Sequence, residues 1–248
     1  MKERLASIVL RKGWASSREE AALLIAEGRI RVNALVRTDP TIQADYDRVE
    51  CDPREKTFRY AGRGGLKLEG ALDFFSIILD GKRVVDLGAA TGGFTDCLLR
   101  RGALSVTAVD VGRGLIDFRL RTDPRVVVVE EANVRFPGPW MPRDPVDGVV
   151  ADLSFISLRQ ILPQVDFLLR GGGWFLGLVK PQFEASPEYV EKGGIVRDPR
   201  VRRLVLRRFL EDLVRHEGIP RGIAPSIVKG RKRGNQEYFC FAWWKGKP

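Results

Sequence analysis

The chain of 248 residues carries 42 lysines and arginines against 32 aspartates and glutamates, a net charge of +10. Hydrophobic residues make up 44% and charged residues 30%, which is typical of a globular protein, and no apolar run reaches the roughly 18–20 residues of a membrane-spanning helix. Three scattered cysteines and a single histidine exclude a disulfide framework and a histidine-rich metal site, so we expect no metal. An apolar stretch near the N-terminus is broken by Arg11 and Lys12, so we expect a cytoplasmic protein. The positive charge indicates a polyanionic partner, with nucleic acid first and a generally basic proteome as the alternative.

The first 52 residues have the pattern of a small helical unit followed by a hairpin. Apolar residues within 5–10 predict a short helix, and Ser17–Glu20 has capping-box spacing, so a second helix is expected from Arg18. Two β-prone runs flank the pair Asn33-Ala34, which predicts a tight hairpin, and Val49–Cys51 would add a last strand.

Beyond residue 62 the chain alternates between apolar strands and helices. This alternation predicts an α/β, Rossmann-like fold with a seven-stranded, mostly parallel sheet, and strands that are apolar throughout fit a sheet covered on both faces. We expect the strands at Arg83–Leu87, Ser105–Asp110, Val126–Glu130, Gly148–Asp152, Trp174–Val179, Gly222–Val228 and Glu237–Trp244. Helices are expected over Gly65–Phe75, after Gly93, after Ser157 and over Pro199–Glu217.

A polar linker at 53–62 separates the N-terminal helix-and-hairpin pattern from the alternating strands and helices. We therefore expect an α+β domain with its linker at 1–59 and a larger α/β domain at 60–248. Residues 1–59 carry 12 basic and 10 acidic residues, so most of the net charge lies in the larger domain. A nucleic-acid partner would then contact both domains.

A glycine-rich loop follows the first strand of the predicted sheet. Asp86-Leu87 ends the strand and Gly88–Gly93 leads into a helix, so the loop lies at the edge where doubly wound sheets bind ligands. The glycines are spaced GxxxGG rather than GxGxxG, so the pyrophosphate fingerprint of NAD-binding proteins is missing. Asp86 would repel a phosphate but suits a cationic cofactor, and Asp110 at the end of the second strand can bind both hydroxyls of a ribose.

These features indicate S-adenosylmethionine as the cofactor and a methyltransferase as the class of enzyme. Asn133, after the third strand, is the candidate for an adenine contact, with a turn residue as the alternative. The expected cofactor contacts are Asp86, Gly88, Ala89, Thr91, Gly92, Gly93, Phe94, Asp110, Val111, Asn133 and Asp152.

The N-terminal segment resembles the S4 domain, a small RNA-binding module. The likeness rests on Leu5, the Gly13–Ala21 and Gly28–Asn33 segments, and Val36. In that family, basic residues of the two helices touch the RNA backbone, and a solvated surface is the alternative for each of them. The candidates for RNA contact, with those of the larger domain included, are Arg4, Arg11, Lys12, Arg18, Arg29, Arg63, Lys229, Arg231, Lys232 and Arg233.

The larger segment resembles the FtsJ-like ribose 2′-O-methyltransferases, and the whole chain resembles the TlyA family of ribosomal RNA methyltransferases, historically labelled hemolysins. The shared stretches are Arg63–Leu72, Asp86–Asp96, Asp152–Leu158, Val179–Glu184 and Gly234–Phe239. The resemblance implies a catalytic tetrad of Lys67, Asp152, Lys180 and Glu237. A ribose hydroxyl is a poor nucleophile until its proton is removed or shared, so Lys180 is the expected base, with Asp152 and Glu237 as orienting groups.

The sequence thus predicts a ribosomal RNA cytidine 2′-O-methyltransferase whose partner is ribosomal RNA or a ribosomal subunit and not a membrane. A non-catalytic S4-type RNA-binding factor and a hemolysin-like membrane-active protein are the alternatives. Phe94, Phe155 and Phe183 lie beside the shared motifs and are candidates to stack on a base, with core packing as the alternative. The short stretch after Glu237, compared with longer tails in relatives that act on both subunits, favours the large ribosomal subunit.

Overall fold

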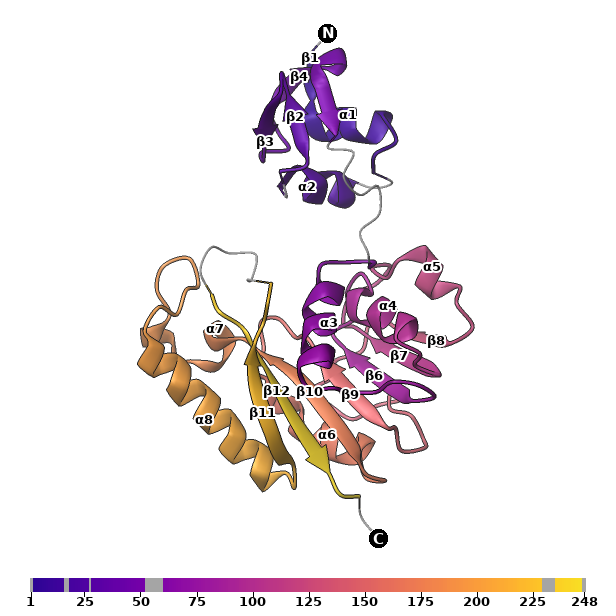
Figure 1. The fold of residues 1–248 in the computed structure, drawn as a ribbon, viewed down its shortest axis with the longest axis vertical. Helices are drawn as coiled ribbons and strands as arrows, with labels where there is room; N and C mark the ends of the chain where they lie inside the picture. The colour runs from indigo at the N-terminus through magenta and orange to yellow at the C-terminus, as the bar shows by residue number, and fades with distance from the viewer. Residues whose placement is uncertain (1, 16–17, 27, 52–59, 229–234, 247–248) are drawn as a thin grey trace. The chain divides into compact units, whose positions relative to one another are not determined.

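The computed structural model describes residues 2–15, 18–26, 28–51, 60–228 and 235–246 (Figure 1). The chain divides into two compact units, Met1–Phe58 and Arg59–Pro248. Each unit buries apolar side chains of its own, so each has a separate hydrophobic core.

The smaller unit packs two helices with two small antiparallel sheets. Helices α1 (Leu5–Arg11) and α2 (Arg18–Ala26) contribute apolar side chains to its core, where Leu5, Ile8 and Ile25 are fully buried. One sheet has the order β3-β2-β5, and β1 pairs with β4 in the other. The strands are β1 (Lys2–Arg4), β2 (Ile30–Val32), β3 (Leu35–Arg37), β4 (Gln43–Asp45) and β5 (Val49–Cys51), and the 3₁₀ turn η1 spans Tyr46–Arg48.

The predicted helices, hairpin and last strand of this unit are confirmed. Asn33 and Ala34 both adopt left-handed backbone, with φ of 52° and 63°, as a two-residue hairpin turn requires. The predicted capping box at Ser17–Glu20 lies partly outside the described residues, so it stays a prediction. The pairing of β1 with β4 was not predicted, because Lys2–Arg4 and Gln43–Asp45 contain no β-branched or aromatic residue.

A seven-stranded sheet forms the centre of the larger unit. Its strands are β6 (Arg83–Leu87), β7 (Ser105–Val109), β8 (Val126–Val129), β9 (Gly148–Ala151), β10 (Gly173–Val179), β11 (Ile219–Pro225) and β12 (Tyr238–Trp244). They lie in the order β11-β12-β10-β9-β6-β7-β8, with β12 antiparallel to both neighbours and the pairs from β10 to β8 parallel. The predicted mostly parallel, Rossmann-like sheet is confirmed.

Helices cover both faces of this sheet (Figure 1). Helices α3 (Gly64–Phe74) and α4 (Gly93–Arg100) share one core with alternate side chains of the strands. The 3₁₀ turn η2 (Leu158–Ile161) and helices α6 (Leu162–Leu168) and α8 (Pro199–Arg215) share the other core. Side chains of a strand point alternately to its two faces, so Phe175 and Leu176 of β10 enter different cores.

Two differences from the prediction have local causes. Strand β11 was expected at Gly222–Val228 but spans Ile219–Pro225, where pairing with β12 fixes it, while the apolar Ile227 beyond it is 72% exposed. The short helices α5 (Phe118–Arg121) and α7 (Pro181–Glu184) and the 3₁₀ turn η3 (Pro187–Tyr189) were not predicted. One helical turn is too short to show a 3.6-residue period.

Candidate active site

The glycine-rich loop joins β6 to α4 at the carboxyl edge of the parallel strands. Gly88 and Gly92 have φ of 88° and 90°, a conformation that favours glycine. A Cβ atom on Gly88 would lie 2.9 Å from the carbonyl oxygen of Asp152, and one on Gly92 would lie 2.3 Å from Leu120 Cδ1. Both positions therefore require glycine for its backbone conformation and for its lack of a side chain.

Asp86 lies one residue before the end of β6 and is fully buried. The Thr95 hydroxyl donates a hydrogen bond to its Oδ2 atom at 2.7 Å, whereas the buried Oδ1 atom has no hydrogen-bond partner among the described residues. Burial raises the pKa of the Asp86 carboxyl to about 7, against the lowering effect of the Thr95 hydrogen bond. The site thus contains a buried carboxyl with unused hydrogen-bonding capacity.

Asp110 follows β7 and fixes two neighbouring loops. Its Oδ2 atom accepts a hydrogen bond from Ala90 N at 2.8 Å, and its Oδ1 atom accepts one from Gly112 N at 2.7 Å. Asn133 Oδ1 accepts from Arg135 N at 3.1 Å, which is the contact of a turn residue.

The other expected cofactor contacts differ in exposure. Val111 is 71% exposed and Thr91 is also exposed, whereas Ala89 and Phe94 are buried. Ala89 N donates to Val109 O at 3.1 Å, so the N–H group of this residue is already engaged within the fold.

The four tetrad positions come from four elements. Asp152 follows β9, Lys180 follows β10, Glu237 precedes β12 and Lys67 lies in α3. Val179 pairs with Tyr238 in adjacent strands, which brings the neighbouring Lys180 and Glu237 to the same edge of the sheet. Because β9 and β10 are parallel, their carboxyl ends meet at that edge too.

These four side chains form two ion pairs. Lys67 Nζ lies 2.7 Å from Glu237 Oε2, and Lys180 Nζ lies 2.7 Å from Asp152 Oδ1. Lys180 Nζ also donates a hydrogen bond to Ser154 Oγ at 2.9 Å, a contact that was not predicted. Lys180 and Glu237 are only 8% and 3% exposed, so both ion pairs are held largely out of water.

The three aromatic residues that were candidates to stack on a base differ in their exposure to solvent. Phe94 is 3% exposed and stacks on Phe239 with ring centroids 6.1 Å apart, so it belongs to the core. Phe155 is 88% exposed, has left-handed backbone with φ of 68°, and lies 5.4 Å from the Phe183 ring. Lys180 Nζ is 5.8 Å from the centre of the Phe183 ring. An exposed aromatic surface therefore adjoins the lysine.

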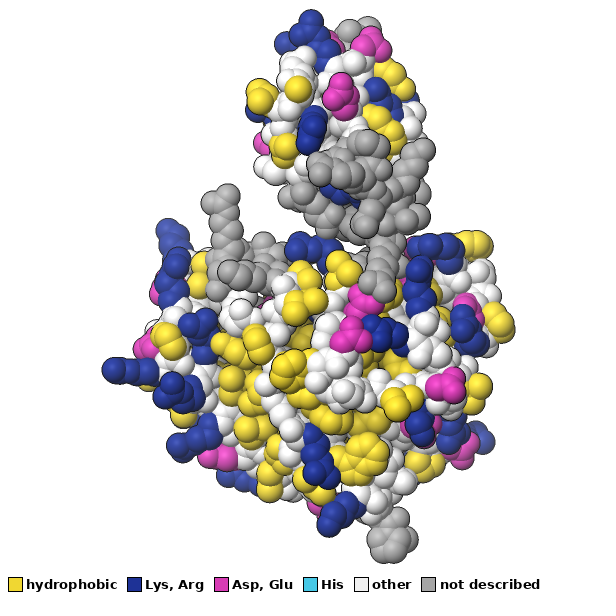
Figure 2. All heavy atoms as spheres, viewed as in Figure 1, with side chains coloured by type: hydrophobic (Ala, Val, Ile, Leu, Met, Phe, Trp, Pro, Cys, Tyr) yellow, Lys and Arg dark blue, Asp and Glu magenta, His cyan; other side chains and the backbone are white. Residues whose placement is uncertain are grey.

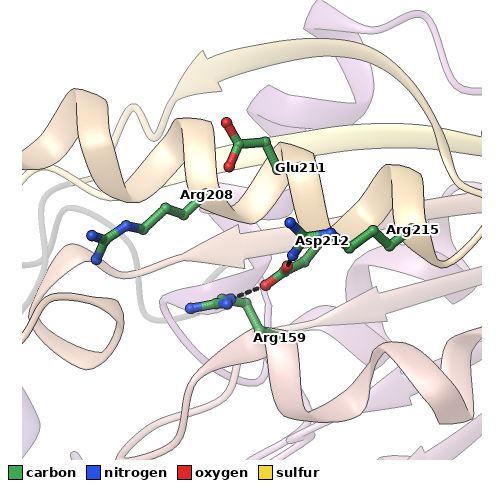
Figure 3. Close-up of a pocket in the computed structure, with 5 residues that line it drawn as sticks. All are labelled: Arg159, Arg208, Glu211, Asp212 and Arg215. Atoms are coloured by element: carbon green, nitrogen blue, oxygen red, sulfur yellow. Dashed lines mark hydrogen bonds and ion pairs between the residues drawn. The ribbon is translucent and has the colours of Figure 1, made fainter.

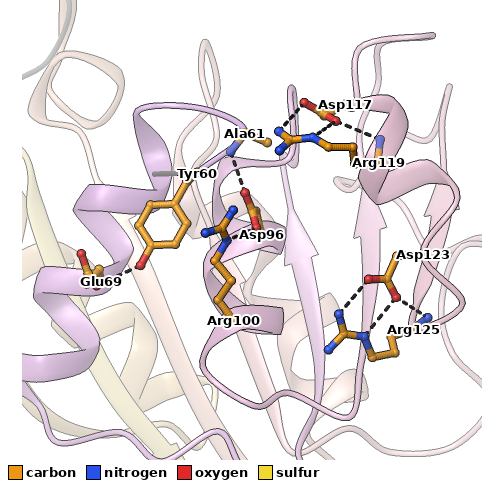
Figure 4. Close-up of polar contacts among 9 residues, drawn as sticks. All are labelled: Tyr60, Ala61, Glu69, Asp96, Arg100, Asp117, Arg119, Asp123 and Arg125. Atoms are coloured by element: carbon orange, nitrogen blue, oxygen red, sulfur yellow. Dashed lines mark hydrogen bonds and ion pairs between the residues drawn. The ribbon is translucent and has the colours of Figure 1, made fainter. Parts of the chain in front are cut away.

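The segment that enters the larger unit is fastened to α3 and α4 (Figure 4). The Tyr60 hydroxyl donates to Glu69 Oε1 at 2.9 Å, and Ala61 N donates to Asp96 Oδ2 at 2.8 Å. Arg100 Nε pairs with the other oxygen of Asp96 at 2.6 Å. Asp96 closes the predicted loop motif, but its anchoring role was not foreseen, because its partner is the backbone of a distant segment.

The predicted RNA-contacting residues of the smaller unit differ in exposure and in the contacts that they already make within the unit. Lys12 Nζ donates to Val49 O at 2.9 Å and lies 4.5 Å from the centre of the Tyr46 ring, so its charge already has partners within the unit. Arg11 pairs with Glu3 at 2.8 Å, while Arg4 and Arg18 are exposed and Arg29 is partly buried. Arg63 is the N-cap residue of α3. The predicted residues Lys229, Arg231, Lys232 and Arg233 lie outside the described part of the chain.

A hollow of about 350 Å³ lies between η2 and α8 (Figure 3). Its lining is mixed in charge, and Arg159 at the start of η2 pairs there with Asp212 of α8. The lining residues are Arg159, Arg208, Glu211, Asp212 and Arg215. No predicted site residue is among them, so this hollow is separate from the tetrad.

A sheet in which β12 lies antiparallel beside β10, with a glycine-rich loop between β6 and α4, has a methyltransferase fold. A solved S-adenosylmethionine-dependent methyltransferase from Mesorhizobium loti shares it, at a TM-score of 0.54 and 16% identity over 73% of this chain and all of that one. The chain belongs to the FtsJ-like methyltransferase family, whose model matches residues 60–243, and the S4 domain model matches residues 3–42.

Two closer relatives match nearly the whole chain. The 16S/23S rRNA (cytidine-2′-O)-methyltransferase TlyA of Mycobacterium tuberculosis is 40% identical over 94% of this chain and 87% of its own. A solved structure from Streptococcus thermophilus, provisionally named a hemolysin, has a TM-score of 0.77 and 34% identity over all of this chain and 90% of its own. The resemblances to the S4, FtsJ-like and TlyA families are thereby confirmed.

Proposed function

We propose that the protein transfers the methyl group of S-adenosylmethionine to the ribose 2′-hydroxyl of a cytidine in ribosomal RNA. The observation that carries this proposal is the convergence of Lys67, Asp152, Lys180 and Glu237 in two largely buried ion pairs. Membership of the FtsJ-like family supports methyl transfer, and the name of the M. tuberculosis relative supports cytidine in ribosomal RNA. A ribosomal target would place the protein in the cytoplasm.

The loop residues fit this cofactor. The buried Oδ1 atom of Asp86, which has no hydrogen-bond partner in the described part of the chain, belongs to a carboxyl and so suits the cationic amino group of S-adenosylmethionine. Gly88 and Gly92 keep the backbone open to close approach by a ligand. When bound, the cofactor supplies an electrophilic methyl group on a sulfonium. The remaining expected contacts, from Asp110 to Asn133, belong to the same proposal.

Lys180 is the proposed base. Asp152 and Ser154 hold its Nζ atom through two N–H groups, so the lone pair has a fixed direction once the ammonium has released its third proton. The neutral amine would accept the proton of the ribose hydroxyl, which would make that oxygen a nucleophile toward the methyl group that the bound cofactor would supply. Glu237 holds Lys67, whose ammonium group stabilises the negative charge that develops on that oxygen.

RNA contacts are proposed in both units. The S4-like unit with its linker would span 1–59 and the methyltransferase unit 60–248, and the smaller unit would offer Arg4 and Arg18. On the larger unit the exposed ring of Phe155 adjoins the tetrad and suits stacking on an unpaired base. The basic segment 229–233 precedes Glu237 in the chain and is part of the same proposal.

The outward side of α8 offers further positive charge. Lys and Arg side chains gather along the margin of the larger unit over this helix (Figure 2). Spacings of three and four residues place the exposed Arg200, Arg203 and Arg207 on one side of the helix. The exposed Arg208 and Arg215 lie seven residues apart beside it, and Arg207 and Arg215 pair with Glu211 and Asp212. Within the described residues, no carboxylate lies at ion-pair distance from Arg200 or Arg203. This surface therefore suits the phosphates of a large RNA.

Incubation with tritiated S-adenosylmethionine and ribosomal subunits that lack the modification tests the proposal. We expect alkali-stable label in one dinucleotide of the ribosomal RNA, because a 2′-O-methyl group blocks strand cleavage at that ribose. Small and large subunits are tested separately, which decides the target subunit. Absence of label from the RNA of both subunits would reject the enzymatic proposal and favour the non-catalytic RNA-binding alternative.

The provisional hemolysin name of the S. thermophilus structure makes membrane lysis a second candidate. In the described ranges, no helix has both the length and the apolar character needed to cross a bilayer. Dye-filled liposomes provide the test, with the Lys180→Ala variant in parallel. Leakage at low protein concentration would establish a lytic activity beside methyl transfer.

A further inference from the structure

Two short segments carry the Lys180–Asp152 ion pair, and Glu184 joins them. One segment runs from Asp152 after β9 to Ser157, and the other runs from Lys180 through α7. Glu184 Oε1 accepts a hydrogen bond from Leu158 N at 2.7 Å, and its Oε2 atom accepts one from the Ser157 hydroxyl. A single carboxylate thus bridges the end of one segment to the end of the other.

The chain places Glu184 at a fixed offset from Lys180. Pro181 begins α7, and Phe183 N and Ala185 N donate to the carbonyls of Lys180 and Pro181 at 2.9 Å each. Proline in a first helical turn has its φ already set. This single turn therefore carries the Glu184 carboxyl as a rigid extension of the backbone that carries Lys180.

The segment held by Glu184 is strained. Phe155 has a φ of 68°, a left-handed conformation that is unfavourable for an aromatic residue and persists only where the surroundings enforce it. Asp152 N donates to Leu87 O at 3.1 Å at one end of the turn, and the Glu184 bridge fixes the other end. Between these anchors lie Ser154, which accepts from Lys180, and Phe155 itself.

Glu184 has no other assignment in the site. Burial raises the pKa of its carboxyl, while the hydrogen bonds from Ser157 and Leu158 oppose that rise. Arg159 follows Leu158 and pairs with Asp212 of α8, so the start of η2 is held by Glu184 on one side and by Asp212 on the other. A partly buried carboxyl that joins two active-site segments through two hydrogen bonds indicates a structural role in the site.

We propose that Glu184 is a positioning residue, which ties Ser157-Leu158 to the turn after Lys180 and so keeps Asp152, Ser154 and Phe155 in register with the lysine amine. This inference rests on the proposed 2′-O-methyl transfer. Glu184 touches no reacting atom, so its loss misplaces Lys180 and the turn relative to each other. A misplacement of about 1 Å costs roughly 100-fold in rate.

Glu184→Ala, Glu184→Gln and Ser157→Ala test the inference through kcat, KM for ribosomal RNA, the Kd for S-adenosylmethionine and the thermal midpoint. We expect Glu184→Ala to lower kcat by roughly 10–100-fold with the cofactor Kd unchanged. Glu184→Gln should stay within a few-fold of the wild type, because an amide can accept from Leu158 N and donate to the Ser157 hydroxyl. Ser157→Ala, which removes one of the two bonds, should fall between them.

Val205→Ala is the control for stability, because Val205 is a buried core residue of α8 outside the site. If Glu184→Ala lost no more kcat than a Val205→Ala protein with the same thermal midpoint, the positioning role would be overturned. A parallel loss of cofactor affinity would overturn it as well. Wild-type protein that labels no ribosomal RNA would instead reject the proposed function, and this inference with it.

Discussion

Lys67 and Glu237 are 170 positions apart in the chain, and the fold brings Lys67 Nζ to 2.7 Å from Glu237 Oε2. The lysine comes from the helix before the first strand of the large sheet, and the glutamate precedes its last strand. Their side chains are 11% and 4% exposed. The ion pair therefore joins the two ends of the larger unit across the proposed active site.

Loss of one partner of this pair should destabilise the protein. Glu237→Ala leaves the Lys67 ammonium largely buried without a counter-charge, and breaking a buried pair costs roughly 3–5 kcal/mol. The double variant Lys67→Met/Glu237→Leu should recover most of that stability in urea unfolding while remaining inactive. If the double variant were as unstable as the single one, the loss would come from packing and not from the stranded charge.

Lys180→Ala should slow methyl transfer strongly and spare cofactor binding. A general base contributes roughly 10²–10⁴-fold to a rate, so we expect kcat to fall within that range. Lys82→Ala is the matched control, because Lys82 is a half-exposed lysine before β6, at the opposite end of the strands. Single-turnover labelling of ribosomal RNA measures the step, and near-normal turnover by Lys180→Ala would assign the base elsewhere.

The raised pKa of Asp86 predicts an unusual pH dependence of cofactor binding. A cationic amino group binds the ionised carboxyl, so the affinity of the wild type should rise as the pH increases through about 7. Asp86→Asn should bind weakly, with a flat profile between about pH 6 and 8. Isothermal titration calorimetry measures both, and a flat wild-type profile would show that Asp86 does not titrate in that range.

The same carboxyl should affect the stability of the cofactor-free protein in the opposite direction. Its pKa rises from 3.8 to about 7 on folding, so the folded state holds the proton more tightly than the unfolded chain does. Stability should therefore fall as the pH rises from about 4 to about 7 and level off above that. Asp86→Asn should raise the thermal midpoint more at about pH 8 than at about pH 5.

Phe155 and Phe94 should respond differently to truncation. Stacking on a base is worth roughly 1–3 kcal/mol, so Phe155→Ala should raise KM for RNA or lower kcat without lowering the thermal midpoint. Phe94→Ala removes a buried core ring and should cost roughly 3–5 kcal/mol of stability. Unchanged kinetics for Phe155→Ala would leave its exposed ring without a role in RNA binding.

Sequence patterns predicted the sheet well because its strands are apolar runs separated by glycines and polar turns. Strand β6 was predicted to the residue, and β10 to within one. The tetrad came from motif resemblance, since no periodicity indicates that Lys67 meets Glu237. Local pattern also could not separate Phe94 from Phe155, because each follows a polar or glycine-rich turn and tertiary packing alone decides which ring is buried.

Glu184 shows the same limit. It stands inside a motif that was recognised, yet its partners Ser157 and Leu158 are 27 and 26 positions away. A carboxylate after a single helical turn is equally suited to solvent, and its partners become apparent only when β9 and β10 are placed side by side.

The arginines of α8 give a last prediction, on affinity for RNA. Arg200→Glu/Arg203→Glu reverses two exposed charges that have no carboxylate partner within the described residues, and it should weaken binding to ribosomal RNA with kcat at saturation unchanged. The slope of log K against log salt should become shallower by about 0.7–0.9 for each phosphate that the variant no longer neutralises. Arg143→Glu, at an exposed arginine before the amino end of β9, reverses one charge where the double variant reverses two, and should change neither quantity. Equal weakening per reversed charge in both variants would mean that net charge, and not this side of the helix, attracts the RNA.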